Sequence, residues 1–228
     1  MINILNTRIN RANYIYQTRG FSHLIMQIIR FLFSQYRVFF QYSHYYLYEH
    51  TLEELNEADF LPSIQNYVFK IVNSVEQADK LVTDGFEFPE DITKARYRLT
   101  RGAIAFCIFV DSKLAHIGWV ALTDEAKKTF DSVPYKVNFS NRQACTGGTS
   151  TILEYEGRGL MSYCYFRRFQ FLNEQGMISS RNAVEVSNVA SKKVHAKFNP
   201  RIYAKGRYIR ILWWKSWKEI PIQSTENN

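Results

Sequence analysis

The sequence has few of the residues that mark several common protein classes. Its three cysteines, Cys107, Cys145 and Cys164, form no CxxC pair, which disfavours a zinc site and a disulfide framework. Ten glycines and five prolines are too few for a collagen-like or proline-rich chain. No apolar run reaches the roughly 18 residues that a membrane-spanning helix requires. We therefore expect a cytoplasmic protein with reduced thiols and no metal site.

The composition is that of a globular protein with a basic surface. A hydrophobic fraction of 46% with 22% charged residues is enough to build a core and excludes a disordered chain. A length of 228 residues indicates one domain, or one domain with an elaboration. The net charge of +8 suits an anionic partner, which leaves a phosphorylated cofactor, a nucleic acid and an anionic membrane open.

Positive charge is unevenly distributed along the chain. Residues 1–50 contain five arginines, no lysine and a single acid, Glu49. Residues 192–218 contain nine basic residues and no acid, interleaved with aromatics. Such a mixture can bind single-stranded nucleic acid, or it can be an amphipathic pair of strands. The apolar and basic positions do not separate into two faces, so we give nucleic acid little weight.

Residues 1–65 form an apolar and aromatic N-terminal extension. The apolar run at 20–34 predicts a helix of about four turns, and nine aromatics follow within 31–48. One interpretation is that the extension packs on the rest of the chain or on a second copy in a homodimer. The other is a peripheral membrane anchor, with arginines at the lipid surface. We favour the first, because such runs are more often core.

A domain at 66–220, followed by a polar tail at 221–228, alternates strands and helices. Strands are predicted at 67–72, 103–110, 114–122, 144–153 and 183–186, with two closing strands around Gly206. Ser74 and Gln77 form a capping box for a first helix, and Pro89 begins a second. Further helices are predicted from Leu160 to Gly176 and from Asn188 to about Phe198. The stretch 123–141 is polar and carries no predicted element.

The junction Gly157-Arg158-Gly159 stands between a predicted strand and a predicted helix. A helix N-terminus has unpaired N–H groups and partial positive charge, and glycines before it let a phosphate approach the backbone. The turn lacks the Lys-Ser/Thr of a Walker A loop, and Ser162 stands where a dinucleotide GxGxxG motif needs glycine. A GxG turn alone is weak evidence for a diphosphate site.

The wider pattern resembles the GNAT superfamily of acyl-CoA-dependent N-acyltransferases. The stretch Leu153-Glu154-Tyr155-Glu156-Gly157-Arg158-Gly159 is similar to the family's Q/R-x-x-G-x-G/A diphosphate loop, and the order of elements over about 66–218 agrees. The resemblance implies an α/β fold with a mixed, mostly antiparallel sheet flanked by helices. Glu154 and Glu156 depart from the family pattern. An exposed carboxylate at position 156 would repel a bound phosphate, with an unfavourable interaction energy of about 1 kcal/mol.

The resemblance also implies an activity and a cofactor. The chain would transfer an acyl group, most simply acetyl, from acetyl-CoA or another acyl-CoA to a small amine such as an amino sugar. The strand would hold the pantetheine and the turn the diphosphate, while Asn188, Ser191 and Lys192 share one face of the following helix with His195. The implied cofactor-binding residues are Thr151, Ile152, Leu153, Glu156, Gly157, Arg158, Gly159, Leu160, Met161, Asn188, Ser191 and Lys192.

Three residues are candidates for proton transfer. His195 stands near the family's tyrosine position and could protonate the leaving thiolate, since imidazole titrates near neutrality. The alternative interpretation is that His195 is a polar residue on a solvent-exposed helix face. His116, on the predicted hairpin, and Glu185, after the loop, are candidate general bases. The cysteines are interpreted as core residues.

Other functions stay open at this point. One is the transfer of a longer acyl chain to a membrane-associated acceptor, which a large apolar slot would favour. Another is a non-catalytic module that binds anionic membrane or nucleic acid, because two motif positions are substituted. A third is an aminoacyl-tRNA-dependent transferase, against which the single copy of the motif argues.

Overall fold

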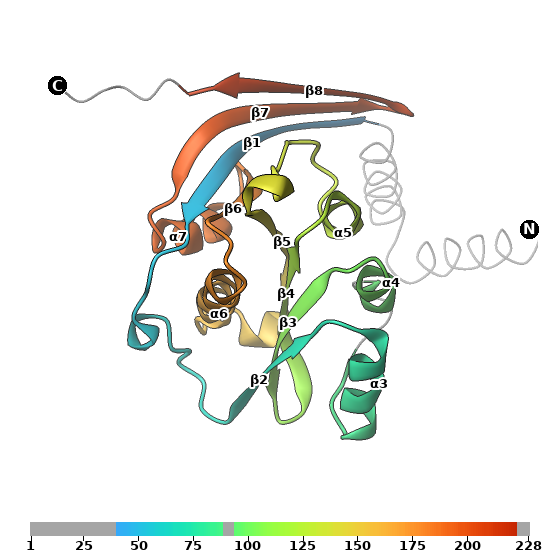
Figure 1. The fold of residues 1–228 in the computed structure, drawn as a ribbon, viewed down its shortest axis with the longest axis vertical. Helices are drawn as coiled ribbons and strands as arrows, with labels where there is room; N and C mark the ends of the chain where they lie inside the picture. Colours follow the sequence, from blue (N-terminus) through green and yellow to red (C-terminus); the bar gives the residue numbers. More distant parts are fainter. Residues whose placement is uncertain (1–39, 89–93, 223–228) are drawn as a thin grey trace, which may run out of the picture. The chain divides into compact units, whose positions relative to one another are not determined.

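The computed structural model describes residues 40–88 and 94–222 (Figure 1). The predicted helix at 20–34 and the predicted helix start at Pro89 lie outside the described residues. The chain divides into two compact units. The described part of the smaller unit comprises 40–43 and Tyr208–Trp217, and that of the larger unit comprises His44–Arg207 and 218–222. The candidate site lies within the larger unit.

The described residues contain eight strands, hydrogen bonded in the order β2-β3-β4-β5-β6-β1-β7-β8. Neighbours β2 to β5 are antiparallel, β5 and β6 are parallel, and β6 and β1 are antiparallel. This mixed, mostly antiparallel sheet confirms the predicted fold class. The strands are β1 (Phe40–Thr51), β2 (Tyr67–Val72), β3 (Ile104–Val110), β4 (Lys113–Ala121), β5 (Gln143–Thr151), β6 (Ser179–Glu185), β7 (Arg201–Ile211) and β8 (Trp214–Pro221).

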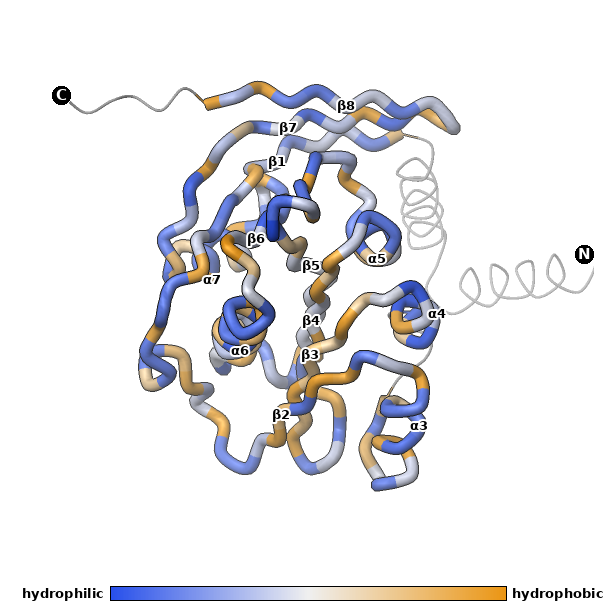
Figure 2. Tube along the Cα trace, in the orientation of Figure 1, coloured by the Kyte–Doolittle hydropathy of each residue, from blue (hydrophilic) through white to orange (hydrophobic). Residues whose placement is uncertain are grey.

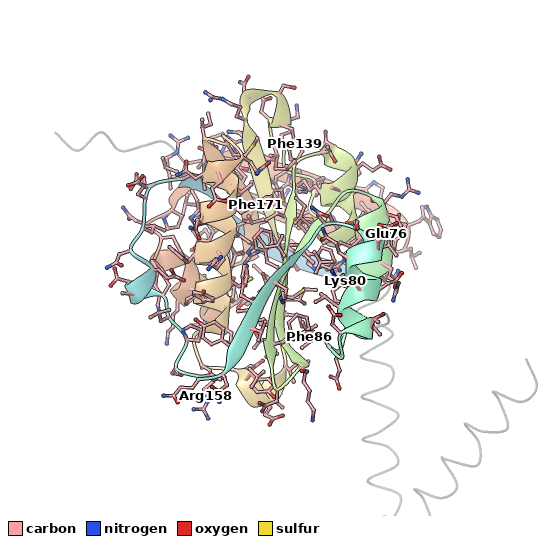
Figure 3. All side chains as sticks on the ribbon, turned by 60° about the horizontal axis from the view of Figure 1, so that its bottom comes forward. Glu76, Lys80, Phe86, Phe139, Arg158 and Phe171 are labelled. Atoms are coloured by element: carbon pink, nitrogen blue, oxygen red, sulfur yellow. The ribbon has the colours of Figure 1, made fainter. Side chains whose placement is uncertain are left out.

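Helices cover both faces of the sheet in the larger unit. On one face lie α6 (Leu160–Glu174) and α7 (Val189–Ala196), and on the other lie α3 (Val75–Thr83), α4 (Ala95–Thr100) and α5 (Asp124–Phe130) (Figure 1). Figure 3 shows the layers from another side, with Phe171 on α6 and Lys80 on α3. Short 3₁₀ turns occur at η1 (Glu57–Asp59), η2 (Phe139–Asn141) and η3 (Leu153–Tyr155). None of the described helices is long and apolar enough to cross a membrane.

The core lies between α6 and the central strands β3 and β4, which are mostly hydrophobic (Figure 2). It also holds a fully buried arginine, Arg168, which donates hydrogen bonds to the carbonyl oxygens of Cys164 (3.3 Å) and Trp119 (3.4 Å). Its guanidinium carbon lies 3.6 Å from the ring centroid of Tyr165. A Cβ at Gly118 would meet that carbon at 2.9 Å, so glycine leaves the space that the arginine occupies. The core therefore contains a permanent positive charge.

Local signals explain most helix ends. The Ser74 hydroxyl accepts from the N–H of Gln77 (3.2 Å), and the Gln77 side chain accepts from the N–H of Asn73 (2.9 Å), which confirms the predicted capping box. Gly176, at φ +71°, follows the last turn of α6 as predicted. The three cysteines are buried, which confirms their assignment to the core.

Two segments differ from the prediction. The polar stretch 123–141, for which no element was predicted, contains α5, whose N-cap hydroxyl at Thr123 accepts from the N–H of Ala126 (3.2 Å). The two strands predicted around Gly206 are one strand, β7, in which Gly206 is buried. The chain turns instead at Leu212, where φ is +54°, and leucine is not a residue that marks turns.

The first strand comes from the stretch that we assigned to the N-terminal extension. Its residues 45–51 pair with residues 179–185 of β6, so β1 lies between β6 and β7. Glu49 on β1 accepts hydrogen bonds from Arg181 (3.0 Å) and Gln143 (2.9 Å), which ties it to β6 and β5. The boundary at residue 65 therefore does not coincide with an edge of the sheet.

Candidate functional site

The sheet forks between β5 and β6. The two strands pair only at Gln143–Ser179, Ala144–Ser180 and Cys145–Arg181. Beyond these pairs β5 stays bonded to β4 as far as Thr151, while β6 stays bonded to β1 as far as Glu185. The facing backbone edges of β5 and β6 therefore separate. Peptide groups along the open edge of β5 are available to a ligand.

A bulge in β5 shapes the fork. The register between β4 and β5 shifts between Ile117 and Trp119. Opposite this shift, Gly148 has φ +56°, and a Cβ there would lie 2.9 Å from Cδ1 of Trp119. Only glycine fits this conformation without strain. Gly148 thus allows β5 to bend at the bulge.

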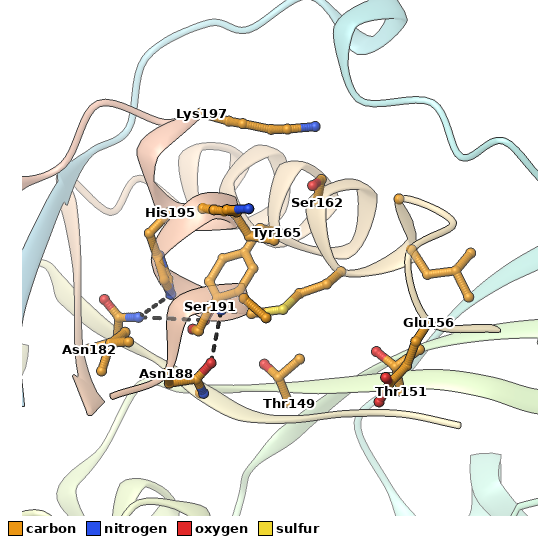
Figure 4. A pocket seen from close by; sticks show the side chains of 18 of the residues that line it. Thr149, Thr151, Glu156, Ser162, Tyr165, Asn182, Asn188, Ser191, His195 and Lys197 are labelled. Atoms are coloured by element: carbon orange, nitrogen blue, oxygen red, sulfur yellow. Dashed lines mark hydrogen bonds between the residues drawn. The ribbon is translucent and has the colours of Figure 1, made fainter. Parts of the chain in front are cut away.

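A cavity of about 610 Å³ occupies the fork (Figure 4). This volume lies within the range of small-molecule and cofactor sites. Its walls come from β5, β6, the turn before α6, the first turns of α6 and most of α7. The polar side chains that line it are those of Thr149, Thr151, Tyr155, Glu156, Ser162, Tyr165, Asn182, Asn188, Ser191, Lys193, His195 and Lys197.

The N-terminus of α6 opens on this cavity. Gly159 is the N-cap at φ +84° and makes no side-chain cap hydrogen bond. The first N–H to bond within the helix is that of Tyr163, which donates to the carbonyl of Gly159 (3.0 Å). The N–H groups of residues 160–162 therefore have no acceptor within the helix, and these residues line the cavity. Together they form an anion-binding surface.

A contact from the loop after η1 holds the turn in place. The backbone N–H and the hydroxyl of Ser63 both donate to the carbonyl oxygen of Arg158, at 3.0 and 3.3 Å. Gly159 lies against Pro62, whose Cα would be 3.5 Å from an added Cβ. The peptide N–H groups of the turn are thus preorganised before a ligand binds.

A buried polar network lies beneath the fork. Nδ1 of His195 lies 3.1 Å from Nε2 of His50. Nε2 of His195 lies 2.9 Å from Nδ2 of Asn182 (Figure 4). Nδ2 of Asn182 also lies 3.5 Å from the Tyr165 hydroxyl. All four residues are at most 2% exposed. His195 was predicted either as a catalyst or as a residue on a solvated face, and the second interpretation is wrong, because α7 packs it against β1 and α6.

Burial keeps both histidines of this network neutral. Desolvation lowers the pKa of His50 to about 3 and lowers that of His195 well below its ordinary value, and the positive charge of Arg168 adds to both shifts. Since the Asn182 amide nitrogen can only donate, Nε2 of His195 accepts and its Nδ1–H donates to His50. Asn182 Oδ1 is then left to accept, and it has no partner among the described residues.

Thr149 and Thr151 line the opposite wall of the fork. Oγ1 of Thr149 is buried without a partner in the described part of the chain. Oγ1 of Thr151 lies 2.7 Å from Nδ1 of His116, which is 1% exposed. Desolvation and the charge of Arg168 lower the pKa of His116 to about 3, so its ring is neutral. His116 does not line the cavity. Its contact orients Thr151.

The structure brings most of the predicted site residues together. Those lining the cavity are Thr151, Glu156, Gly157, Gly159, Leu160, Met161, Asn188, Ser191 and His195. Ile152 and Leu153 do not line it. The strand ends at Thr151, and these two residues are exposed at the start of η3. The remaining predicted residues that do not line the cavity are Arg158, Lys192, His116 and Glu185. The N–H of Glu156 donates to Leu153 O (3.2 Å) and is not free for a phosphate.

Sequence reasoning missed several residues of the cavity. Lys193 and Lys197 line it in place of Lys192. Their i, i+4 spacing on a helix was a usable signal. Asn182, Tyr165 and Thr149 carried no such signal, because their position depends on where β5 and β6 separate. The two positive charges of these lysines exceed the one negative charge of Glu156, so the lining has a net positive charge.

Comparison with solved structures identifies the architecture. No protein-family model and no curated protein sequence matches the chain. A GCN5-related glucosamine N-acetyltransferase region of a fungal multi-domain GH3 β-N-acetylglucosaminidase matches with a TM-score of 0.50 at 12% identity. The match covers 79% of this chain and 22% of that chain. The chain has the GNAT fold. The predicted resemblance is thereby confirmed at the level of fold.

Further structures with the GNAT fold are similar over comparable lengths. An acetyltransferase of the GNAT family from Colwellia psychrerythraea matches with a TM-score of 0.46 at 18% identity, over 79% of this chain and 57% of that chain. A putative GNAT acetyltransferase from Novosphingobium aromaticivorans matches with a TM-score of 0.45 at 12% identity, over 72% and 62%. The chain thus spans less than two thirds of the length of each of these proteins.

Proposed function

We propose that this chain is an N-acyltransferase that moves an acyl group, most simply acetyl, from coenzyme A to a small amine. The observation that carries the proposal is the continuity of the fork with the uncapped N-terminus of α6. An open strand edge and an anion-binding helix terminus share one cavity. An acyl-CoA has this composition, because an amide-bearing pantetheine arm leads to a diphosphate.

The lining fits both parts of such a ligand. The free N–H groups at the start of α6, together with Lys193 and Lys197, would hold the phosphates. The open edge of β5 and the unpartnered oxygens of Thr149 and Asn182 would pair with amide groups of the arm or with the acceptor amine. An acyl-CoA would supply an activated thioester.

The reaction requires a proton donor and a proton acceptor. The amine nitrogen attacks the thioester carbonyl carbon, so that a C–N bond forms and the C–S bond breaks. The amine loses a proton and the leaving thiolate gains one. Both ring nitrogens of His195 are engaged inside the core, so we propose that His195 positions Asn182 rather than protonating the thiolate. The Tyr165 hydroxyl, which lines the cavity, can supply that proton.

The general base remains a prediction. Glu185 is exposed and follows Val184, which lines the cavity, so it stays a candidate at the entrance. His116 is the weaker candidate, because it is buried, does not line the cavity and has a pKa lowered to about 3, which makes it a weak base. We propose that it serves instead to orient Thr151 at the open edge of β5.

A thermal-shift titration with acetyl-CoA tests the proposal. A ligand at about one hundred times its Kd adds about 2.7 kcal/mol to the free energy of unfolding. For a chain of this size, Tm should rise by roughly 5–10 °C. The rise should persist at high salt, because the contacts are partly buried, whereas nonspecific binding of a polyanion would disappear. No rise with acetyl-CoA or longer acyl-CoAs, in a folded sample, would contradict the proposal.

The acidic residue of the turn supplies a second test. Glu156 lines the cavity and opposes phosphate, so Glu156→Gln should tighten coenzyme A binding by about fivefold, the equivalent of about 1 kcal/mol. Glu154→Gln is the matched control, because Glu154 is exposed on the same turn but does not line the cavity. Isothermal titration calorimetry measures both affinities. An equal gain in both variants would show that only the overall charge matters, and would place the diphosphate away from Glu156.

A further inference from the structure

The β7–β8 hairpin ends in four consecutive apolar residues that face solvent. Ile211 and Leu212 are 45% and 46% exposed, and Trp213 and Trp214 are 86% and 53% exposed. We call residues 211–214 the hairpin tip. All four belong to the smaller unit, and Trp213 is the most exposed of the large hydrophobic residues in the described part of the chain. A single exposed apolar residue is ordinary, whereas a contiguous group usually marks an interaction surface.

The charge around the tip limits the kind of partner. Arg210 precedes the tip and Lys215 follows it, both within the smaller unit. No aspartate or glutamate occurs anywhere in 192–218, and none occurs in 1–39. The partner must therefore accept large apolar side chains next to negative charge. Two copies of the chain meeting tip to tip would bring their own cations together, which is unfavourable.

An anionic lipid surface meets both requirements. Tryptophan and leucine enter the boundary between headgroups and acyl chains, where an indole keeps its polar edge hydrated. Flanking arginine and lysine are attracted by anionic headgroups. The tip lies at the turn that joins two paired strands, β7 and β8, so most of the backbone groups beside it are already bonded.

We propose that the hairpin tip inserts into the interface of an anionic bilayer and holds this protein at a membrane surface. The occupant is the lipid itself and not a protein. This inference goes beyond the proposed acyl transfer and does not depend on it, because the tip and the cavity belong to different units of the chain.

Quenching of tryptophan emission by brominated lipid tests the insertion. The full chain has four tryptophans, of which Trp119 is fully buried. Vesicles of equimolar phosphatidylcholine and phosphatidylglycerol, with the phosphatidylcholine dibrominated, should quench the emission. In the variant Trp213→Phe, Trp214→Phe, which keeps the apolar surface, most of the quenching should be lost although binding persists. Residues 1–39 contain no tryptophan, so quenching reports insertion of the tip and not membrane binding through residues 1–39.

Co-sedimentation with the same vesicles, without bromine, tests affinity. Leu212→Ser combined with Trp213→Ser should lower the partition coefficient by about tenfold or more, and replacing phosphatidylglycerol by phosphatidylcholine should have a similar effect. Tyr97→Ala on α4 is the matched control, since Tyr97 is aromatic and 52% exposed but remote in sequence from the tip. Circular dichroism confirms that each variant is folded.

Three outcomes would overturn the proposal. The first is the absence of vesicle binding. The second is vesicle binding without quenching of Trp213 and Trp214, which would assign membrane contact to another segment. The third is a dimer in analytical ultracentrifugation that dissociates when the tip is substituted and does not bind vesicles, which would identify a second copy as the occupant.

Discussion

Lowering the pH from about 7 to about 5 is expected to reduce the free energy of unfolding by about 4 kcal/mol, a large fraction of the stability of an ordinary domain. The cause is two histidines, His50 and His116, that are buried in neutral form. Desolvation and the positive charge of Arg168 lower the pKa of each to about 3. His195 acts in the same direction, because desolvation, His50 and Arg168 lower its pKa well below the ordinary value.

The sign of the effect follows from proton binding. Between pH 6.5 and about 3 the unfolded chain binds a proton at His50 and at His116, and the folded chain does not. Stability is therefore complete above the unfolded pKa of 6.5 and falls as the pH decreases toward the folded pKa. Each of these two histidines contributes a slope of about 1.4 kcal/mol per pH unit, or about 3 kcal/mol per pH unit for the pair.

Urea unfolding at a series of pH values measures this slope. In His116→Gln one titrating group is removed, while an amide can still bond Thr151, so the slope should fall by about 1.4 kcal/mol per pH unit. His44→Gln is the matched control, because it makes the same substitution at an exposed histidine. A slope that is the same in the wild type and in His116→Gln would show that this histidine takes up its proton without unfolding.

Replacing Gly157 by alanine should weaken coenzyme A binding by about thirtyfold, the equivalent of one lost charge-assisted hydrogen bond of about 2 kcal/mol. Gly157 has φ +74° and lines the cavity at the entrance to α6. An added methyl group would keep a phosphate from the N–H groups of the turn. The same substitution should cost about 1 kcal/mol of stability, because alanine is strained at positive φ.

Gly85→Ala is a closely matched control for this variant. Gly85 has φ +87°, and like Gly157 it has no atom within 4 Å of an added Cβ. It lies after α3, away from the cavity. Both variants should lose similar stability in urea unfolding, whereas only Gly157→Ala should lose affinity in calorimetry. An equal affinity in both variants would remove the diphosphate from the turn, and an affinity loss in both would point to general destabilisation.

Local signals in the sequence predicted much of the larger unit. Runs of β-forming residues predicted β2, β3 and β4, and the Ser74–Gln77 box and the glycines around α6 predicted where helices begin and end. These features act within a few residues, through backbone conformation and capping, so they are visible in one dimension. The GNAT resemblance rested on such a feature, the turn at Gly157–Gly159 before α6.

The chemistry inside the fork was not visible in this way. The sequence could place a glycine turn before a helix, but it could not place His50 of β1 against His195 of α7, 145 residues away. Nor could it show that Arg168 is a buried cation whose charge lowers the pKa of three histidines. It also could not show that Asn182 lies where β5 and β6 separate. Side chains acquire these neighbours only when the sheet is assembled, since strand order and burial are set by packing between distant segments. What the sequence determined was therefore most of the elements and the glycine turn before α6. The tertiary structure alone decided which polar groups face the cavity, and burial beside Arg168 decided that the histidines stay neutral.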